Sequence, residues 1–353
     1  MRQLLLTTAL AGACCFYISA AAAQKAAPAP SAQKAAPAQA APPAQEQDQG
    51  EVDAPTPVPL LVGGLVIASN PALDVEAIDI VVNFKKVTQT YRIKNGGAAE
   101  LRVPASVAMP DLTASADGAE EYNIDASKPE NPVGLTVTAG GAPVATRAVV
   151  RAEALGLDRL AEIKAANLPL TPFGADSDKA LKALKPDQVL KLSDIGLLSP
   201  PEADQPDIPS LADWTLSVTH TWDQSLPPGK TTDIAISFTP SSAQYALTKE
   251  NADALDAFKD DACLSAQTIK TLKTKLGGKT PTPMTLTEIN VSTDKPMRWR
   301  PAPATNVSVE KPTPEAIVAF CGADAKTAGQ PKVMGKIEDE GSELRVIIIA
   351  PTK

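Results

Sequence analysis

The chain has 353 residues, of which 44% are hydrophobic and only 4% aromatic, and it contains 33 prolines. Such a composition argues against a helical bundle and favours short strands separated by turns, with aliphatic side chains supplying most of the core. The formal net charge of -8 repels phosphate backbones and anionic lipid headgroups, so it argues against nucleic-acid binding.

The first residues have the pattern of an export signal. Arg2 provides a positive start, an uncharged and mostly apolar run follows, and small residues end it. This pattern predicts a signal peptide over residues 1–23 that is cleaved after Ala23. A lipidated cysteine at Cys14, which follows "LAGA", is the alternative. Either route predicts an exported bacterial protein, periplasmic or secreted, that has no transmembrane segment after cleavage.

Residues 24–59 consist almost entirely of alanine, proline, glutamine and charged residues. A segment of this kind buries too little apolar surface to offset the entropy of ordering, so we expect a disordered, partly extended tether. The simplest role for it is that of a spacer. A second hypothesis is that it lets the folded part stand away from a membrane or pass through a cell-wall mesh.

From Gly63 onward, polar and apolar residues alternate, which predicts half-buried antiparallel strands. "GLTVTAGGAPVATRAVV" repeats the scheme, and Gly140 and Gly141 are expected at its turn. The apolar faces of the two strands before it are expected to carry Val87, Tyr91 and Ile93, and then Leu101, Val103, Ala105 and Val107.

An insertion rich in alanine and leucine interrupts this alternation over residues 151–205. Its charges fall on one side of each segment and its prolines end the segments, so we expect short helices. Strands resume at "WTLSVTHTWDQSLPPGK", residues 214–230. We expect this segment and "TDIAISFTP" to form a hairpin with a wide loop.

His220 is the only histidine in the chain. A catalytic histidine needs a partner that orients it and a substrate within reach. On the predicted strand its same-face neighbours are valine and tryptophan, in the series Trp214, Leu216, Val218, His220 and Trp222. We therefore expect His220 to face the core or to form the wall of a cleft, rather than to act in catalysis or bind a metal.

Two further helices are expected after Ser241, the second with Ser265 as its N-cap and Gly277 at its end. About five strands follow. Cys263 and Cys321 are the only cysteines outside the predicted signal, and an even count in an exported protein favours a disulfide between them. Two separate buried thiols are the alternative.

The sequence provides few motifs for chemistry. Glycine patterns for phosphates or dinucleotides, histidine-rich zinc motifs and a serine nucleophile elbow are all missing, so we assign no catalytic residue, no metal site and no cofactor. Trp299 lies between Arg298 and Arg300, as in a binding loop for an acidic or sugar ligand. An ordinary exposed loop with stacked guanidinium groups has the same pattern.

The chain contains, in this order, the segments "GGLVIASNPALDVEAIDI", "VTQTYRIKN", "PASVAMPDL", "WTLSVTHTWDQSLPPGK", "FTPSS", "CLS" and "AFCG". This ordered series resembles the exported bacterial domain of unknown function 4424 family over residues 63–350. The resemblance implies an envelope or secreted protein without an assigned activity, and it supplies no catalytic residues. The family often has a tyrosine where this chain has His220. The long tether is not a feature expected of the family.

We predict an α+β protein that is mainly antiparallel β. A sandwich-like unit is expected over residues 60–243, with the helical insertion 151–205, and a smaller unit of helices and a sheet over residues 244–353. The function expected is that of a non-catalytic envelope module that binds an envelope protein, a glycan or a small ligand, or that is structural. A hydrolase of envelope material that uses acidic residues is the alternative.

Overall fold

The computed structural model describes residues 56–114, 120–200, 210–278, 282–297, 300–338 and 343–352. The predicted signal peptide and the predicted tether up to residue 55 lie outside these ranges. The described residues belong to one compact unit, Glu51–Lys353. They form mainly antiparallel sheets with a few helices, which confirms the predicted fold class. None of their helices has the length and apolar character needed to span a bilayer.

A six-stranded sheet has the strand order β11-β10-β12-β5-β2, and β6 also pairs with β12. One face of β12 is buried through Leu216, Val218, His220 and Trp222, as the alternation predicts. The other face is in contact with solvent. The strands of this sheet are β2 (Val66–Ile67), β5 (Leu101–Ala108), β6 (Leu112–Thr113), β10 (Arg147–Ala154), β11 (Leu157–Asp158) and β12 (Thr215–Leu226).

A seven-stranded sheet has the order β18-β16-β3-β4-β13-β8-β9, in which only β16 and β3 run parallel. Gly140 and Gly141 form the turn between β8 and β9 with φ values of 57° and 81°, a conformation that glycine adopts without strain. The strands are β3 (Leu73–Asn83), β4 (Lys86–Asn95), β8 (Thr136–Ala139), β9 (Ala142–Pro143), β13 (Thr231–Phe238), β16 (Thr305–Glu310) and β18 (Lys332–Ile337).

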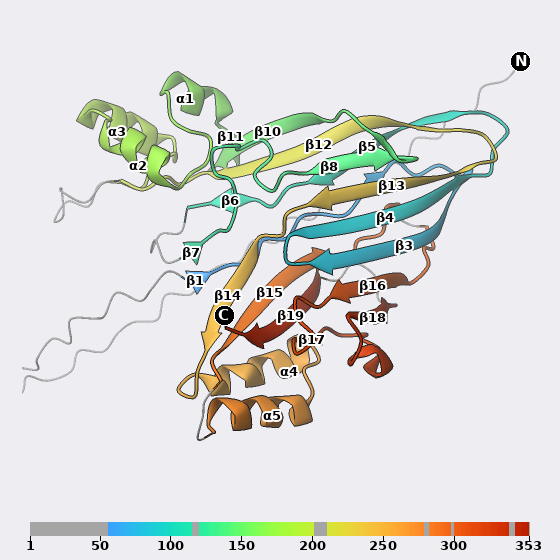
Figure 1. Cartoon of the computed structure of the whole chain (residues 1–353). Helices are drawn as coiled ribbons and strands as arrows, with labels where there is room; N and C mark the ends of the chain where they lie inside the picture. Colours follow the sequence, from blue (N-terminus) through green and yellow to red (C-terminus); the bar gives the residue numbers. More distant parts are fainter. Residues whose placement is uncertain are drawn as a thin grey trace, which may run out of the picture. The chain divides into compact units, whose positions relative to one another are not determined.

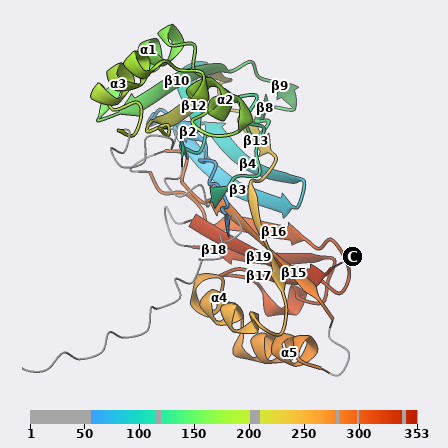
Figure 2. The same cartoon turned by 90° about the vertical axis from the view of Figure 1, so that its left-hand side faces the viewer.

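A four-stranded sheet consists of β14 (Ser242–Leu247), β15 (Met284–Ser292), β19 (Glu343–Pro351) and β17 (Ile317–Ala319), in the order β14-β15-β19-β17. It packs against η1 (Ala252–Ala257), α4 (Phe258–Asp261) and α5 (Ala266–Leu276), as Figures 1 and 2 show. The side chain of Ser265 caps α5 by accepting from the backbone N–H of Thr268, and Gly277 follows the last turn. Both predicted ends of this helix are confirmed.

The remaining short elements are the parallel pair β1 (Thr56–Pro57) and β7 (Glu120–Glu121), and the turn η2 (Ala325–Thr327). The main hydrophobic cluster joins all three large sheets. Tyr91 and Ile234 enter it from the seven-stranded sheet, Val107 and Trp222 from the six-stranded sheet, and Val346 from the four-stranded sheet. The two larger sheets therefore form a sandwich around one aliphatic core.

The predicted hairpin between "WTLSVTHTWDQSL" and "TDIAISFTP" is wrong. β12 pairs with β10 and β5, whereas β13 pairs with β4 and β8 in the opposite layer. Residues 227–230 carry the chain across the sandwich instead of joining hydrogen-bonded neighbours. Two consecutive strands that each bury one face satisfy the same alternation whether they lie side by side or face each other across the core.

The helical insertion is present but starts later than predicted. Residues 147–154 continue as β10, and the helices are α1 (Leu160–Ala165), α2 (Ala175–Lys182) and α3 (Pro186–Asp194). These helices form a second cluster with Trp214, Ala152 and Ala154, beside β10 and β12 in both views (Figures 1 and 2). Ala152 and Ala154 fall within the predicted insertion because alanine favours helices, yet pairing with β12 and β11 holds them in a strand.

The seven-stranded sheet crosses the predicted boundary at residues 243 and 244. β16 and β18 come from the C-terminal segment and extend the sheet at β3, with Val307 opposite Ile80. The division into two folding units therefore stays a prediction, and it must account for a sheet that takes strands from both sides of the boundary.

Candidate functional site

His220 lies on the buried face of β12 and is 6% exposed. Its Nε2 lies 2.9 Å from the backbone carbonyl oxygen of Glu130, and its Nδ1 lies 2.9 Å from Oγ1 of Thr146. Because a carbonyl only accepts, Nε2 carries a proton and donates to Glu130, and Nδ1 forms a hydrogen bond with the threonine hydroxyl. Both ring nitrogens are therefore engaged, and they connect β12 with the loop before β8 and with the start of β10.

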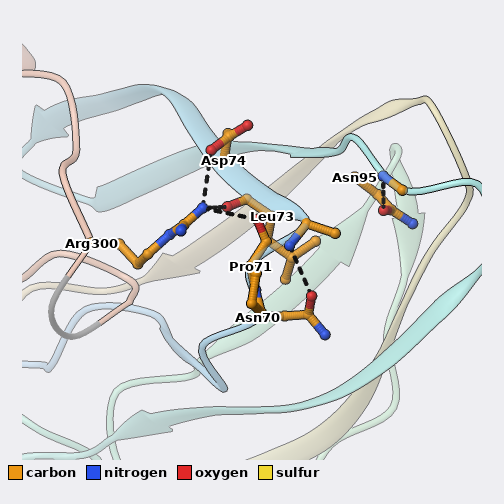
Figure 3. A network of polar contacts seen from close by, with 8 residues as sticks. Asn70, Pro71, Leu73, Asp74, Asn95 and Arg300 are labelled. Carbon is orange, nitrogen blue, oxygen red and sulfur yellow. Dashed lines mark hydrogen bonds and ion pairs between the residues drawn. The ribbon is translucent and has the colours of Figure 1, made fainter.

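Arg300 from the predicted binding loop anchors that loop to the start of β3 (Figure 3). Its Nη2 donates to the carbonyl oxygens of Pro71 (3.2 Å) and Leu73 (2.7 Å) and pairs with Oδ1 of Asp74 (3.2 Å). Arg298 and Trp299 lie outside the described residues. A ligand role for this loop stays a prediction, and the guanidinium of Arg300 already has three partners within the protein.

The two cysteines lie at disulfide distance. The Sγ atoms of Cys263 and Cys321 are 2.09 Å apart and close a loop with a sequence separation of 58. Cys263 directly precedes the segment that caps α5, and Cys321 follows β17. The predicted pairing therefore links the start of a helix to an edge of the four-stranded sheet.

A partly buried ion cluster lies next to the disulfide. Arg345 of β19 holds two carboxylates, with Nε 2.8 Å from Oε1 of Glu288 and Nη1 2.6 Å from Oδ2 of Asp261. Burial raises the pKa of Glu288 above its ordinary value, the positive charge of Arg345 opposes this, and the charges of Glu343 and Asp261 add to it. Burial and the charge of Glu288 also raise the pKa of Tyr245. One cation thus balances several acidic groups.

A cavity of about 390 Å³ opens beside this cluster. It is lined by Asp261, Cys321, Lys336, Glu338, Glu343 and Arg345. Asp261 is paired with Arg345, and Glu338 lies 3.3 Å from Lys336. The cavity therefore combines carboxylates with cations, and two of the carboxylates are in ion pairs.

A larger groove of about 890 Å³ crosses the solvent-facing side of the six-stranded sheet. Register places Val66 opposite Ser106, Ser106 opposite Thr221, and Thr221 opposite Arg147. These four residues form one row across β2, β5, β12 and β10, and all of them are exposed or half-buried. The residues next to them in β2, β5 and β12, such as Ala105 and Trp222, are buried. The groove therefore lies on the outer face of the sandwich.

Two opposite charges stand unpaired in this groove. Arg147 and Asp223 both line it and are exposed, and neither side chain forms a hydrogen bond or ion pair with another described residue. Asp223 lies two residues beyond Thr221 on the same face, so it is a diagonal neighbour of Arg147. Hydroxyl groups of Ser106 and Thr221 and apolar atoms of Val66 and Pro104 are also part of the lining. This arrangement suits a small ligand that carries both a carboxylate and an amino group.

Sequence reasoning missed both sites. Arg147 and Asp223 are outward charges on amphipathic strands, where the usual expectation is simple solvation. Their common groove depends on the register of four strands that are far apart in the sequence. Glu288 and Arg345 give a weak signal, because each is a charged residue inside the strand-like segments "MTLTEINVS" and "ELRVIIIAP". Such a charge requires a partner when both faces of the strand are buried.

Comparison with known proteins gives one family match and weak structural similarity. The model of the family described as domain of unknown function DUF4424 matches residues 56–337. No curated protein matches the chain in sequence. A crystal structure from Legionella pneumophila subsp. pneumophila, of a protein whose description proposes nutrient binding, shares 10% sequence identity and covers 83% of this chain and 70% of its own. Its TM-score is 0.34, too low to bear on function.

Proposed function

The chain belongs to the domain of unknown function 4424 family, and from this premise we propose that it is an exported, non-catalytic binding protein of the cell envelope whose ligand occupies the groove across β2, β5, β12 and β10. The observation that supports the proposal is the pair of opposite charges in that groove, neither of which has a partner among the described residues. Exposed ionic groups are common, but a guanidinium and a carboxylate that share a concave, partly apolar surface without pairing are available to a ligand.

The chemistry of the lining narrows the ligand class. Arg147 offers a planar donor fork that matches a carboxylate, and Asp223 accepts from an amino group. The hydroxyls of Ser106 and Thr221 supply further polar contacts, and Val66 and Pro104 supply apolar ones. Short peptides and oligosaccharides of acidic amino sugars carry these groups, and both occur in the material of a bacterial envelope.

Export is part of the proposal and has separate support. The apolar run at residues 4–23 follows a basic residue, as in a signal peptide. The cysteine pair at disulfide distance agrees with an oxidising compartment, either periplasmic or extracellular. Fractionation of cells that express the full chain, together with the N-terminal sequence of the mature protein, tests this part. Recovery from the cytoplasm with an intact N-terminus would overturn it.

The groove is tested with a panel of dipeptides and acidic amino-sugar oligosaccharides, whose binding is measured by NMR shift perturbation. We expect a member of the panel to bind and to lose about tenfold in affinity in Arg147→Gln and in Asp223→Asn. Arg102→Gln is the matched control, because Arg102 lies on β5 of the same sheet but does not line the groove. Equal affinity in all three variants, or no binding by any member, would contradict the proposal.

A hydrolase is the second candidate, favoured by the cavity of about 390 Å³ beside the ion cluster. Glu288 does not line the cavity but is paired with Arg345, which does; with its pKa raised by burial it would be the proton donor, and Asp261 in the lining would be the second carboxylate. Hydrolysis of purified envelope glycan that Glu288→Gln abolishes and Asp223→Asn leaves intact would favour this function over binding in the groove.

A further inference from the structure

Among the strands that the structure describes, β10 has a neighbour along its whole length on only one side. It pairs with β12 from Arg147 to Glu153, but on its other side β11 pairs only with Glu153 and Ala154. The stretch from Arg147 to Arg151 therefore lies at the margin of the six-stranded sheet, beyond the reach of β11 (Figure 1).

The direction of the backbone groups along this margin follows from Ala152. Its N–H donates to Oδ1 of Asp158 and its carbonyl accepts from the N–H of Arg159, so both groups point away from β12. Backbone groups alternate with a period of two along a strand, hence those of Ala148 and Val150 point the same way. Neither residue has a hydrogen bond on that side to any described residue. Two donors and two acceptors are therefore open to another strand.

The solvent-facing side chains of this margin are Arg147, Val149 and Arg151. Neither arginine forms an ion pair or a side-chain hydrogen bond with a described residue, and Val149 is 37% exposed. Ala148 and Val150 point inward and are half-buried against the main hydrophobic cluster. In a chain with a net charge of -8, this margin is locally basic, with an apolar position between two cations.

We propose that the open edge of β10 is a strand-addition site that receives an extended acidic segment of a partner protein. The added strand would bond to the free groups of Ala148 and Val150, and its acidic residues would lie opposite Arg147 and Arg151. An apolar residue between the acids would lie beside Val149. This surface shares Arg147 with the groove, but Ala148, Val150 and Arg151 do not line the groove, and the proposal does not depend on a ligand there.

A second copy of the chain fits this edge less well. Antiparallel pairing centred on Val149 would place Arg147 of one copy opposite Arg151 of the other, which is a repulsive contact. Pairing centred on Val150 would need the outward groups of Ala152, which Asp158 and Arg159 already occupy. Charge complementarity therefore selects an acidic strand as the occupant.

The test uses a capped, fluorescent peptide with the order glutamate, valine, valine, valine, glutamate, and its binding to the mature protein is followed by anisotropy. We expect saturable binding that falls about tenfold in the double variant Arg147→Glu, Arg151→Glu. A peptide with lysine in place of both glutamates should bind that double variant and not the original protein. This exchange of preference shows that the peptide binds beside Arg147 and Arg151, whereas the proline and methylation tests separate strand pairing from general attraction between charges.

Proline substitutions test the backbone contacts. Ala148→Pro removes an N–H that points away from β12, so we expect a normal fold and loss of peptide binding by about tenfold or more. Val149→Pro removes an N–H of the ladder with β12 and is expected to unfold the sheet. Should Ala148→Pro not fold, a peptide methylated at the amides that would face β10 serves instead, and it is expected not to bind the unmodified protein.

Three outcomes would overturn the proposal. The first is equal peptide affinity in the charge-reversed variant, and the second is full binding by the methylated peptide. The third is a dimer of the free protein that Ala148→Pro dissociates, because it would place a second copy on the edge. Asp223→Asn, which is expected to weaken the groove ligand, should leave peptide affinity within about twofold, so failure of the groove and failure of the edge are distinguishable.

Discussion

His220 holds together three segments that are distant in the sequence. Its ring joins β12 to Glu130 and Thr146 by two hydrogen bonds of 2.9 Å each, in a setting that is 6% exposed. Neither partner is a carboxylate that could orient the ring as a base. The ring thus satisfies its own two polar atoms on a buried strand face by bonding to the Glu130 carbonyl and the Thr146 hydroxyl.

The first prediction concerns this residue. His220→Phe keeps the volume on the buried face but leaves the Thr146 hydroxyl and the Glu130 carbonyl without the ring. We expect the free energy of unfolding to fall by about 1–3 kcal/mol while ligand affinity in the groove is unchanged. Urea unfolding and the NMR titration measure the two quantities. Normal stability with loss of a ligand or an activity would show that the ring has a direct functional role.

The ion cluster gives a prediction about pH. Because burial raises the pKa of Glu288, the folded state holds this proton at pH values where the unfolded state has already lost it. The contribution of Glu288 to the free energy of unfolding therefore falls as the pH rises past 4.5, its ordinary value. Glu288→Gln should gain stability relative to the original protein over this range, which urea unfolding at several pH values measures. A difference that stays constant or shrinks with rising pH would contradict this assignment.

At the scale of elements, the alternation in the sequence predicted which face of each strand is buried. It did so for β4, β5 and β12, where Tyr91, Val103 and Trp222 all lie inside. The capping residue Ser265 likewise located the start of α5. The neighbour with which each strand pairs was not predictable in this way, because alternation describes one strand alone. The wrong hairpin between β12 and β13 and the late start of the helical insertion both follow from this.

The disulfide links two elements, because it joins the segment before α5 to the segment after β17. Cys263→Ser should lower the free energy of unfolding by about 4 kcal/mol under oxidising conditions, the value that the chain-entropy model gives for a loop of this size. With reductant present, the original protein and the variant should unfold alike. If melting under oxidising conditions is the same for both, the bond does not form in solution.

At the scale of the whole molecule, the seven-stranded sheet contains strands from both predicted units, and this limits how the chain can be divided. A fragment that ends at residue 243 lacks β16, so Ile78, Ile80 and Val82 of β3 lose the strand that pairs beside them. It also lacks Val346 and Ile348, which close the main cluster. We expect residues 56–243 to show no cooperative unfolding, whereas residues 56–353 should. Cooperative unfolding of the fragment would support the predicted unit at residues 60–243.

The candidate sites also belong to the whole molecule. Sequence reasoning selected His220, the two cysteines and the loop around Arg300, since each stands out by residue type. The groove and the edge of β10 depend on Arg147, Asp223 and Arg151, which are ordinary surface charges in the sequence. Only the register of the six-stranded sheet brings the first two into one groove and places the third beside an unpaired backbone.

Amide hydrogen exchange along β10 tests the central claim, that this sheet presents an open margin to a partner strand. In the free protein, the amides of Ala148 and Val150 should exchange much faster than those of Val149 and Arg151, which point toward β12. Addition of the acidic peptide should slow the first pair and leave the second unchanged. Slow exchange at Ala148 and Val150 without peptide, or protection that develops only elsewhere, would contradict the account.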